Sequence, residues 1–224
     1  MQRLAEYRVF WRQFREQYHT TGAVLPSGRA LSRALAHYVR TADTAHVGRA
    51  RRILEVGPGT GAVTSQIVRD MRADDHLTMV ERNDQFVSHL RNEIDTAIDF
   101  QPARDRINLV HSGLEELPQE QHYDLIISGL PLNNFSVDLV DCLLGKMKQL
   151  LAPGGILSFF EYVAIRRAKA IVSPASDRQR LRGIEQILNN LLAGAEVRRD
   201  LVLTNVPPAW VHHVCPKRLS EAAS

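Results

Sequence analysis

At 224 residues the chain is long enough for one well-buried α/β domain with a terminal extension. Its hydrophobic content of 44% and charged content of 24% are ordinary for a globular protein. Its two cysteines are too few for a disulfide framework or a metal site, and no apolar run is long enough to span a bilayer. The net charge of +3 is unevenly distributed, because both ends are basic and residues 53–164 are acidic; basic ends favour an anionic partner such as a phosphate-bearing ligand, an anionic membrane or a nucleic acid.

The first eighteen residues concentrate aromatic side chains between arginines. At helical spacing, one narrow stripe holds Leu4, Tyr7, Trp11, Phe14 and Tyr18, with Phe10 beside it and Arg8, Arg12 and Arg15 along one flank. Rings flanked by guanidinium groups suit the headgroup layer of an anionic membrane. The pattern predicts an amphipathic helix that docks on a membrane; the alternative is a helix that packs this stripe against its own domain.

A strand, a glycine turn and a helix follow one another from residue 53. The apolar run Ile53–Val56 predicts a buried parallel strand, and Val63, Ile67 and Met71 recur at helical spacing. Between them stand Gly57, Gly59 and Gly61, which allow the backbone at a helix N-terminus to approach an anionic ligand. A second apolar strand ends at Glu81, where a carboxylate can accept hydrogen bonds from two ribose hydroxyls.

Glu55 indicates which kind of nucleotide ligand the glycine turn can bind. Glu55 stands two residues before the first glycine and would repel a pyrophosphate, which argues against a dinucleotide. It suits a ligand that presents an ammonium group near the turn and only a carboxylate to the backbone. S-adenosylmethionine (SAM) has that pattern.

The remaining elements continue an alternation of strands and helices. We expect strands in residues 107–113, 123–132, 154–162, 196–204 and 210–215, and helices over about 138–151 and 177–192. The residues after about Lys217 read as a frayed tail.

The strand, glycine and acid pattern resembles the class I SAM-dependent methyltransferases. Their motif I is matched by Glu55, Gly57, Gly59 and Gly61, and their motif II acid by Glu81. The resemblance implies a Rossmann-like sheet in the order 3-2-1-4-5-7-6 with strand 7 antiparallel, and a SAM site that also includes Ser27, Arg82, Gly113, Leu114 and Ser128. Because Gly113 stands where the family often has an Asp for the adenine amine, that contact would fall to the backbone of Gly113 and Leu114.

The chain has a closer resemblance to bacterial phospholipid N-methyltransferases of the PmtA type. The matching motifs are Thr21–Ser27, Ser128–Phe135, Gly154 and Gly155 leading to Tyr162, and Asn205–Ala209. The resemblance implies N-methylation of phosphatidylethanolamine and its mono- and dimethyl forms towards phosphatidylcholine, with a phospholipid and an anionic membrane surface as partners. It also implies a cytoplasmic enzyme held peripherally at the inner face of the cell membrane. A related group that methylates ornithine lipids is an alternative.

Other functions remain as alternatives with weaker support. An RNA adenine N-methyltransferase would use the basic ends, but Gly129-Leu130-Pro131-Leu132 stands where such enzymes carry an Asn or Asp acceptor and a stacking ring, so we expect no nucleic acid partner. A soluble small-amine methyltransferase and a non-enzymatic membrane-binding module are the others. We expect no metal, and the oligomeric state stays open.

An amine must lose its proton before it attacks a methyl group, so a proton acceptor is needed. We favour Tyr162, which matches the strand 5 tyrosine of the family, followed by Tyr18 and His19; His111 and Glu161 are weaker candidates, and Glu161 should point away from Tyr162. The expected substrate residues are Asn133, Asn134, Phe135 and Arg166, the last beginning a basic hook with Arg167, Lys169, Arg178, Arg180 and Arg182. The expected domains are a docking helix and lid over 1–40, a methyltransferase domain over 41–217 and a tail over 218–224.

Overall fold

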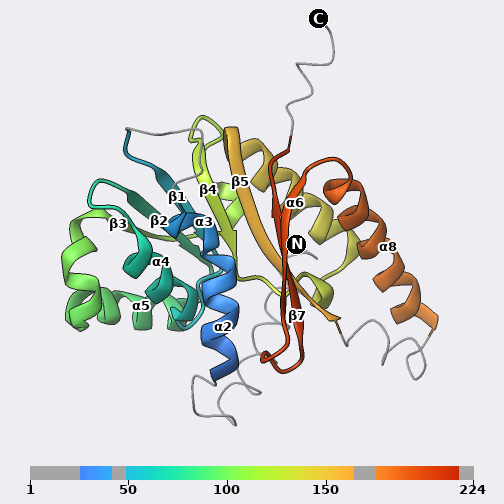
Figure 1. Ribbon diagram of the computed structural model, residues 1–224, viewed down its shortest axis with the longest axis horizontal. Coiled ribbons are helices and arrows are strands. Elements are labelled where there is room, and N and C mark those ends of the chain that lie inside the picture. Colours follow the sequence, from blue (N-terminus) through green and yellow to red (C-terminus); the bar gives the residue numbers. More distant parts are fainter. Residues whose placement is uncertain (1–25, 42–48, 164–174, 217–224) are drawn as a thin grey trace, which may run out of the picture.

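Seven strands form one sheet in the computed structural model, which describes residues 26–41, 49–163 and 175–216 (Figure 1). The strands lie in the order β3-β2-β1-β4-β5-β7-β6. The pairs among the first five are parallel, whereas β7 is antiparallel to both β5 and β6. The predicted order and the antiparallel seventh strand are therefore confirmed. The strands are β1 (Arg52–Val56), β2 (His76–Glu81), β3 (Ile107–His111), β4 (Tyr123–Ser128), β5 (Leu151–Tyr162), β6 (Glu196–Val202) and β7 (Ala209–Val214).

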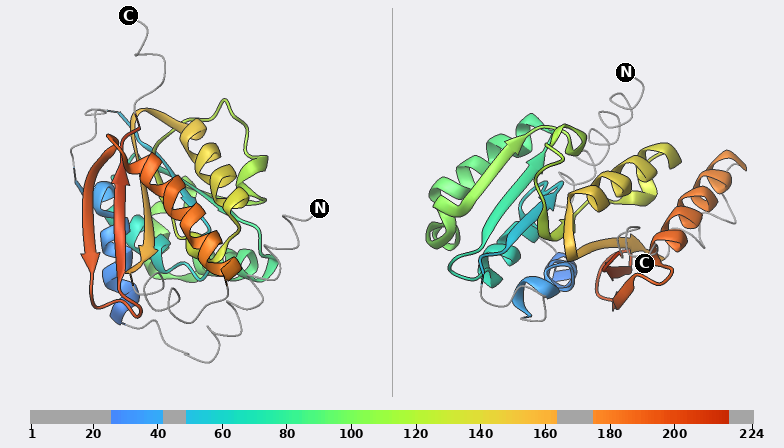
Figure 2. Two further views of the ribbon diagram at one scale, coloured as in Figure 1. Left: turned by 90° about the vertical axis from the view of Figure 1, so that its right-hand side faces the viewer. Right: turned by 90° about the horizontal axis from the view of Figure 1, so that it is seen from above.

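Helices cover both faces of this sheet. Figure 2 shows α6 and α8 together on one side of the sheet and α2 on the other. The α-helices are α2 (Pro26–Leu35), α3 (His37–Arg40), α4 (Ala62–Asp70), α5 (Asp84–Thr96), α6 (Val137–Leu150) and α8 (Ala175–Leu192), and the 3-10 helices are η1 (Ile98–Arg106), η2 (Leu114–Glu116) and η3 (Leu132–Asn134). None of the helices in the described ranges combines the length and apolar character needed to cross a bilayer.

Alternation along the strands divides the core into two clusters. In β1, Leu54 and Val56 join the cluster beneath α6 and α8, while Ile53 joins the cluster beneath α2, α4 and α5. Glu55 is buried on the same side as Ile53, against α4. The strand that precedes the glycine turn is therefore covered on both faces, which explains why Ile53, Leu54 and Val56 are all apolar and leaves Glu55 as a buried acid.

The predicted helices and strands were mostly placed to within a few residues. Two segments differ from the expectation. The helices α5 and η1, between β2 and β3, were not predicted. In addition, residues 26–40 belong to the packed domain, since Leu35, Ala36 and Val39 are buried in the cluster beneath α2 and α4.

Arg49 and Arg51 hold neighbouring elements together at the start of β1. Arg51 and Asp75 form a fully buried ion pair, with an Nη2–Oδ2 distance of 2.5 Å, and Arg51 also donates to the carbonyl oxygens of Tyr38 and Val39. Arg49 makes two hydrogen bonds to Asp124 at the start of β4. These contacts tie α3 and β2 to the start of β1.

Replacing Asp75 by alanine should lower the free energy of unfolding by about 3–5 kcal/mol, because the Arg51 guanidinium would stay buried without its partner. The loss should appear in urea unfolding followed by circular dichroism. Burial opposes the charge on Asp75, but hydrogen bonds from Arg51 and Arg72 hold the pKa of Asp75 below its usual value. Its stabilising contribution should therefore be complete above about pH 4 and disappear as the pH falls further.

The matched control for this variant is Asp99→Ala. Asp99 pairs with Arg69 at 3.5 Å, and both side chains are more than half exposed. Its removal should change the free energy of unfolding by less than about 0.5 kcal/mol. Equal losses in the two variants would contradict the role given to the buried pair.

Candidate active site

The glycine turn between β1 and α4 has the backbone that its sequence requires. Gly57, Gly59 and Gly61 have φ angles of +68°, +58° and +80°, a left-handed region that other residues rarely adopt. The Gly57 N–H donates to the Val80 carbonyl oxygen at 3.0 Å, which ties the turn to β2. The turn between β1 and α4 is therefore one that glycines are needed to form.

The turn after β4 packs directly against this glycine turn. A Cβ atom on Gly57 would lie 2.4 Å from Leu130 Cδ2, and one on Gly129 would lie 2.8 Å from the Gly57 carbonyl oxygen. The Gly129 N–H donates to the Val56 carbonyl oxygen at 3.0 Å. Because β1 and β4 are neighbours at the point where the strand order reverses, this contact lies where ligands of such sheets bind.

Glu81 joins the end of β2 to the glycine turn. Its carboxylate is buried and accepts hydrogen bonds from the Gly59 N–H at 3.1 Å, the Arg82 N–H at 2.9 Å and the Asn83 N–H at 2.8 Å. Burial raises the pKa of Glu81, and these backbone hydrogen bonds oppose the rise. The carboxylate is thus fixed in place beside the turn, and it has acceptor capacity left for a ribose hydroxyl.

Glu55 is a fully buried acid beside the glycine turn. Neither carboxylate oxygen, nor the Thr64 hydroxyl on α4, has a hydrogen-bond partner among the described residues. Burial raises the pKa of Glu55 to about 8, and the Glu81 carboxylate adds to this rise; the Thr64 hydroxyl and N–H lie close enough to oppose it, although neither meets the geometry of a hydrogen bond to Glu55. A buried acid without a donor is expensive unless a ligand supplies one, and an ammonium group would do so.

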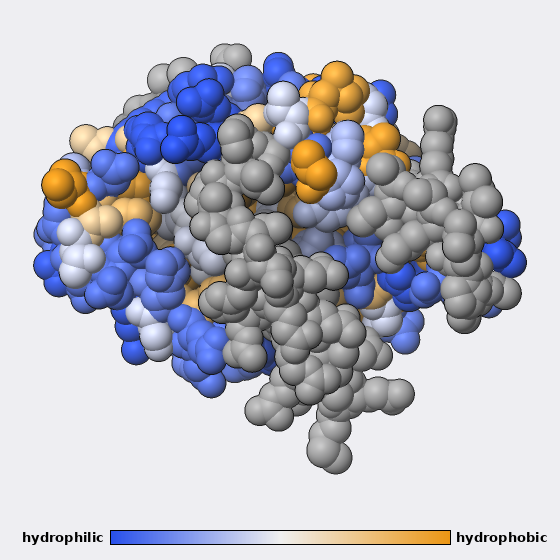
Figure 3. Space-filling model, turned by 90° about the horizontal axis from the view of Figure 1, so that it is seen from below, coloured by the Kyte–Doolittle hydropathy of each residue, from blue (hydrophilic) through white to orange (hydrophobic). Residues whose placement is uncertain are grey.

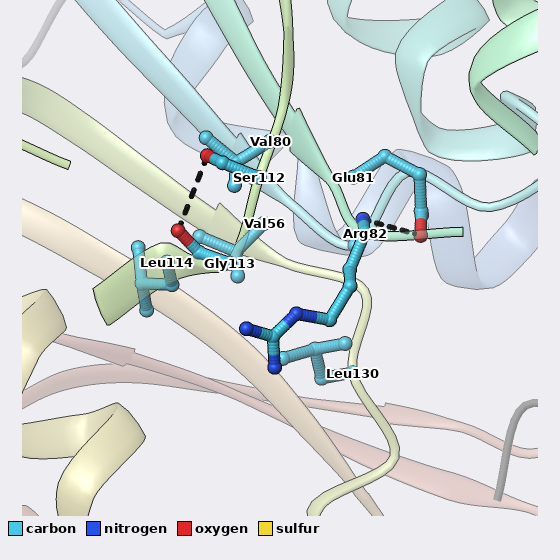
Figure 4. Close-up of a pocket in the computed structure, with 9 residues that line it drawn as sticks. Val56, Val80, Glu81, Arg82, Ser112, Gly113, Leu114 and Leu130 are labelled. Atoms are coloured by element: carbon cyan, nitrogen blue, oxygen red, sulfur yellow. Dashed lines mark hydrogen bonds between the residues drawn. The ribbon is translucent and has the colours of Figure 1, made fainter. Parts of the chain in front are cut away.

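A small, partly open pocket lies at the carboxyl ends of β1, β2 and β4. Figure 4 shows the Arg82 side chain extending across it from the end of β2. Arg82 forms ion pairs with Glu115 at 2.8 Å and Glu116 at 3.1 Å, so it connects β2 to η2. The residues that line the pocket are Val56, Gly57, Val80, Glu81, Arg82, Ser112, Gly113, Leu114 and Leu130.

The backbone of Gly113, at the side of the pocket where the sequence predicts the adenine ring, is already hydrogen-bonded within the protein. The Gly113 N–H, expected to contact adenine, already donates to Glu116 Oε1 at 3.1 Å, and its carbonyl oxygen accepts from the Ser112 hydroxyl at 3.2 Å. A Cβ atom on Gly113 would lie 2.6 Å from Glu115 and 2.7 Å from Arg82. An adenine contact by this backbone would therefore require Glu116 to move, while Leu114 supplies an apolar wall.

The segment after β4 is anchored by an arginine from α8. Arg180 Nη1 donates to the carbonyl oxygens of Asn133 and Phe135, both at 2.8 Å. Asn133 is buried, and its Nδ2 atom has no hydrogen-bond partner within the described chain; Asn134 is exposed. Phe135 packs in the cluster beneath α6 and α8, and Ser128 accepts a hydrogen bond from the Leu130 N–H at 3.3 Å. Arg180, placed in the basic hook by the sequence, thus points inward to position η3.

Tyr162 and Glu161 lie on opposite faces of β5, as predicted. The Tyr162 ring makes an edge contact with Phe160 at 5.1 Å and packs with the cluster beneath α2 and α4. Glu161 lies 3.5 Å from His212, whose ring stacks on Phe159 of the other cluster. His111 lies opposite Glu81 in the register of β2 and β3, and its ring lies 2.9 Å from Asp84. The choice of Tyr162 as proton acceptor stays a prediction.

Several predicted site residues lie outside the described residues. These are Tyr18, His19 and Arg166, together with the membrane-facing set Tyr7, Arg8, Phe10, Trp11, Arg12, Phe14 and Arg15. Helix α2 begins at Pro26, so Ser27 lies within its first turn and not at the cap position before it.

The donors and acceptors of the site fit SAM. Glu55 would hold its ammonium group and Glu81 would bind the ribose. The N–H groups of Gly57, Gly59 and Gly61 already donate to Val80, Glu81 and Pro58, so the cofactor carboxylate would need other donors near the start of α4. Val80, Leu114 and Leu130 give the pocket the apolar surface that an adenine ring requires.

Comparison with known proteins agrees with this fit. A family model described as a methyltransferase domain matches residues 53–155. The ornithine lipid N-methyltransferase of Singulisphaera acidiphila is 26% identical over 152 residues, which cover 68% of this chain and 76% of that protein. The ubiquinone/menaquinone biosynthesis C-methyltransferase UbiE of Psychromonas ingrahamii is 28% identical over 124 residues, but the match spans only 47% of its length.

Solved structures show the same fold at low sequence identity. The 1,6-didemethyltoxoflavin-N1-methyltransferase of Burkholderia thailandensis, solved with S-adenosylhomocysteine, has a TM-score of 0.65 at 16% identity and covers 96% of this chain and 90% of its own. An O-methyltransferase from Bacillus cereus, also in complex with S-adenosylhomocysteine, has a TM-score of 0.58 at 16% identity, with 87% and 83% covered. The family match over residues 53–155, the sheet order and the donors and acceptors of the site together identify a SAM-dependent methyltransferase domain of the class I fold in this chain.

Proposed function

We propose that this methyltransferase methylates the amine of a membrane aminolipid. We expect ornithine lipid to be the preferred substrate and phosphatidylethanolamine to be a poorer one. The observation that carries the proposal is the similarity to an ornithine lipid N-methyltransferase, which extends over 68% of this chain and 76% of that relative. The similarity supports the ornithine-lipid alternative better than the phosphatidylethanolamine activity expected from the sequence motifs.

The turn after β4 argues against a nucleobase substrate. Gly129 is packed against the glycine turn and Leu130 lines the SAM pocket, so neither position supplies the side-chain amide or carboxylate that recognition of a substrate base needs. The first side-chain amide after the strand belongs to Asn133, which is buried in the segment that Arg180 anchors. An aliphatic amine needs no such base-recognition group, because its position can be set by the shape of the pocket.

For methyl transfer the protein must align the substrate amine with the methyl group and must provide one proton acceptor. SAM supplies a methyl group on a sulfonium that needs no further activation. An alkylammonium has a pKa of about 10.4, so a side chain of the protein must accept its proton before the nitrogen can attack. We assign this role to Tyr162, which ends β5 at the edge where the pocket opens, and keep Tyr18 and His19 as the other candidates. The predicted helix over residues 1–18 would bring this edge to an anionic membrane surface.

The proposal is tested with labelled SAM and lipid vesicles. We expect label to appear in ornithine lipid, separated by thin-layer chromatography and identified by mass spectrometry, when vesicles contain ornithine lipid. Vesicles that contain phosphatidylethanolamine instead should give a weaker signal, and vesicles of phosphatidylcholine alone should give none.

Total RNA and small water-soluble amines serve as the competing acceptors in the same assay. Label that appears only in RNA or in a water-soluble amine would overturn the proposal. Label that appears only in phosphatidylethanolamine would retain the aminolipid class and reverse the order of the two substrates.

A further inference from the structure

The turn that joins β6 to β7 exposes apolar side chains. In this turn, residues 203–208, Leu203 is 69% exposed and Val206 is 80% exposed, and Leu201 just before it is 43% exposed. The turn contains no charged residue. Single exposed apolar residues are common, but three of them grouped at the end of a hairpin indicate a contact surface. We call residues 201–206 the hairpin tip.

The hairpin tip is held in place by hydrogen bonds. Asn205 is buried, and its Nδ2 donates to the Pro207 carbonyl oxygen at 2.7 Å. The Val163 N–H donates to the Pro208 carbonyl oxygen at 2.8 Å, which ties the turn to the end of β5. Leu203 and Val206 are therefore presented to solvent by an ordered turn, and a partner would meet them without an ordering cost.

The hairpin tip lies at the same edge of the sheet as the pocket. Ala209, the first residue of β7, pairs with Tyr162, the last residue of β5, so the turn before Ala209 extends beyond the carboxyl end of β5. Figure 1 shows this turn at the lower edge of the molecule, where α2 also begins. Figure 3 looks onto that edge, and hydrophobic residues gather in its upper right part.

Positive charge flanks the hairpin tip. Helix α2 packs against β6 and β7, and it carries Arg29 and Arg33, both exposed and without an ion pair within the described residues. On the hairpin itself the Arg199 guanidinium lies over the Trp210 ring, 4.8 Å from its centroid. Apolar side chains beside exposed guanidinium groups match the layering of acyl chains and phosphates in a membrane.

We propose that the hairpin tip inserts into the headgroup layer of an anionic bilayer and holds the pocket edge against it, an inference that rests on the proposed action on a lipid amine. A second copy of the chain fits less well, because three side chains offer far less than the roughly 800 Å² per partner that a stable interface buries. The arginines that flank the uncharged hairpin tip also fit a surface of uniform negative charge, such as an anionic membrane, better than a second copy of the chain.

The test uses the double variant Leu203→Asp with Val206→Asp, sedimented with vesicles of phosphatidylcholine that contain phosphatidylglycerol. We expect it to bind at least tenfold more weakly than the unchanged protein, because two carboxylates would have to enter the headgroup layer. The matched control is Ile98→Asp on η1, where Ile98 is 85% exposed and lies on a segment remote from the hairpin. That control should bind vesicles as the unchanged protein does.

A fluorescence measurement keeps the test decisive if the double variant folds poorly. The Trp introduced by Leu203→Trp should shift its emission to shorter wavelength with phosphatidylglycerol vesicles and be quenched by brominated lipid, whereas vesicles of phosphatidylcholine alone should give no shift. Equal vesicle binding by the double variant and the unchanged protein would overturn the proposal. So would a dimer that the double variant converts to monomer in sedimentation velocity, since the hairpin tip would then be a subunit interface.

Activity on dispersed substrate separates this inference from the proposed function. The double variant should methylate a short-chain ornithine lipid below its micellar concentration at an unchanged rate and lose activity only on vesicles. If the unchanged protein methylates neither form of the lipid but still requires the hairpin tip for vesicle binding, the proposed function fails and the docking surface stands. If it methylates vesicle lipid and binds vesicles without the hairpin tip, the docking surface fails and the proposed function stands.

Discussion

Replacing Glu55 by glutamine should weaken SAM binding about 100-fold and at the same time make the ligand-free protein more stable. The buried carboxylate lacks a hydrogen-bond donor among the described residues, so it would gain a charge-assisted hydrogen bond only from the ammonium group of the cofactor. Glutamine keeps the shape but not the charge. It should therefore lose most of this interaction without disturbing the strand.

The same residue should make SAM binding depend on pH. Burial raises the pKa of Glu55 to about 8, so near neutral pH the carboxyl group is mostly protonated and must release a proton when an ammonium group binds beside it. Affinity should rise with pH up to about 8 and then level off or fall, because an α-amino group loses its own proton near that pH. The glutamine variant should lack the rise below pH 8.

Calorimetry at pH 6 to 8 in two buffers of different ionisation enthalpy measures both affinity and the protons released. Urea unfolding measures the other half of the prediction. The folded protein holds this proton more tightly than the unfolded chain, so its stability should fall as the pH rises from 4.5 through 8, by an amount on the order of 5 kcal/mol. Glu55→Gln should remove that fall. A variant that binds SAM as tightly as the unchanged protein, with the same proton release, would contradict the assignment.

Replacing Gly57 by alanine should abolish measurable SAM binding and lower the free energy of unfolding by about 2–4 kcal/mol. At a φ of +68° a side chain costs about 1–2 kcal/mol, and the new methyl group would stand 2.4 Å from Leu130 Cδ2. To relieve that contact, the turns after β1 and β4 must separate, which distorts the floor of the pocket. Calorimetry with SAM and urea unfolding measure the two effects.

Two other glycines provide graded controls for this variant. Gly59 has a φ of +58°, but a Cβ atom there would meet nothing within 4 Å, so Gly59→Ala should show only the conformational cost in stability. Gly145 lies within α6 and also has open space, so Gly145→Ala should stabilise the protein by up to about 1 kcal/mol. If Gly57→Ala and Gly59→Ala lose the same stability, the contact with Leu130 has no part in the effect.

The elements that the sequence made predictable are those whose signal is local. The glycine turn stood out because three glycines interrupt an apolar strand and an amphipathic helix, and Glu81 because it ends the next apolar run. Helix α5 carries a comparable local signal. Asn83 caps it through hydrogen bonds to the N–H groups of Gln85 and Phe86, and Val87, Leu90 and Ile94 follow at helical spacing.

The parts of the site that could not be predicted depend on contacts between distant segments. Arg180 and Asn133 are 47 positions apart, and nothing in the charge pattern of α8 distinguishes this inward arginine from its exposed neighbour Arg182. The close approach of Gly129 to Gly57 likewise joins two strands that are separated in sequence by two others. Periodicity indicates which side chains are buried, but it does not indicate which loop they reach.

The position of β7 gives the order in which this enzyme can be completed during synthesis. β7 follows β6 in the sequence but lies between β5 and β6 in the sheet, so β6 joins the rest of the sheet only through residues that leave the ribosome after it. Until Ala209–Val214 emerge, β5 has an open hydrogen-bonding edge that invites pairing with other chains. The sheet therefore closes only when β7 inserts between two strands that have already been synthesised.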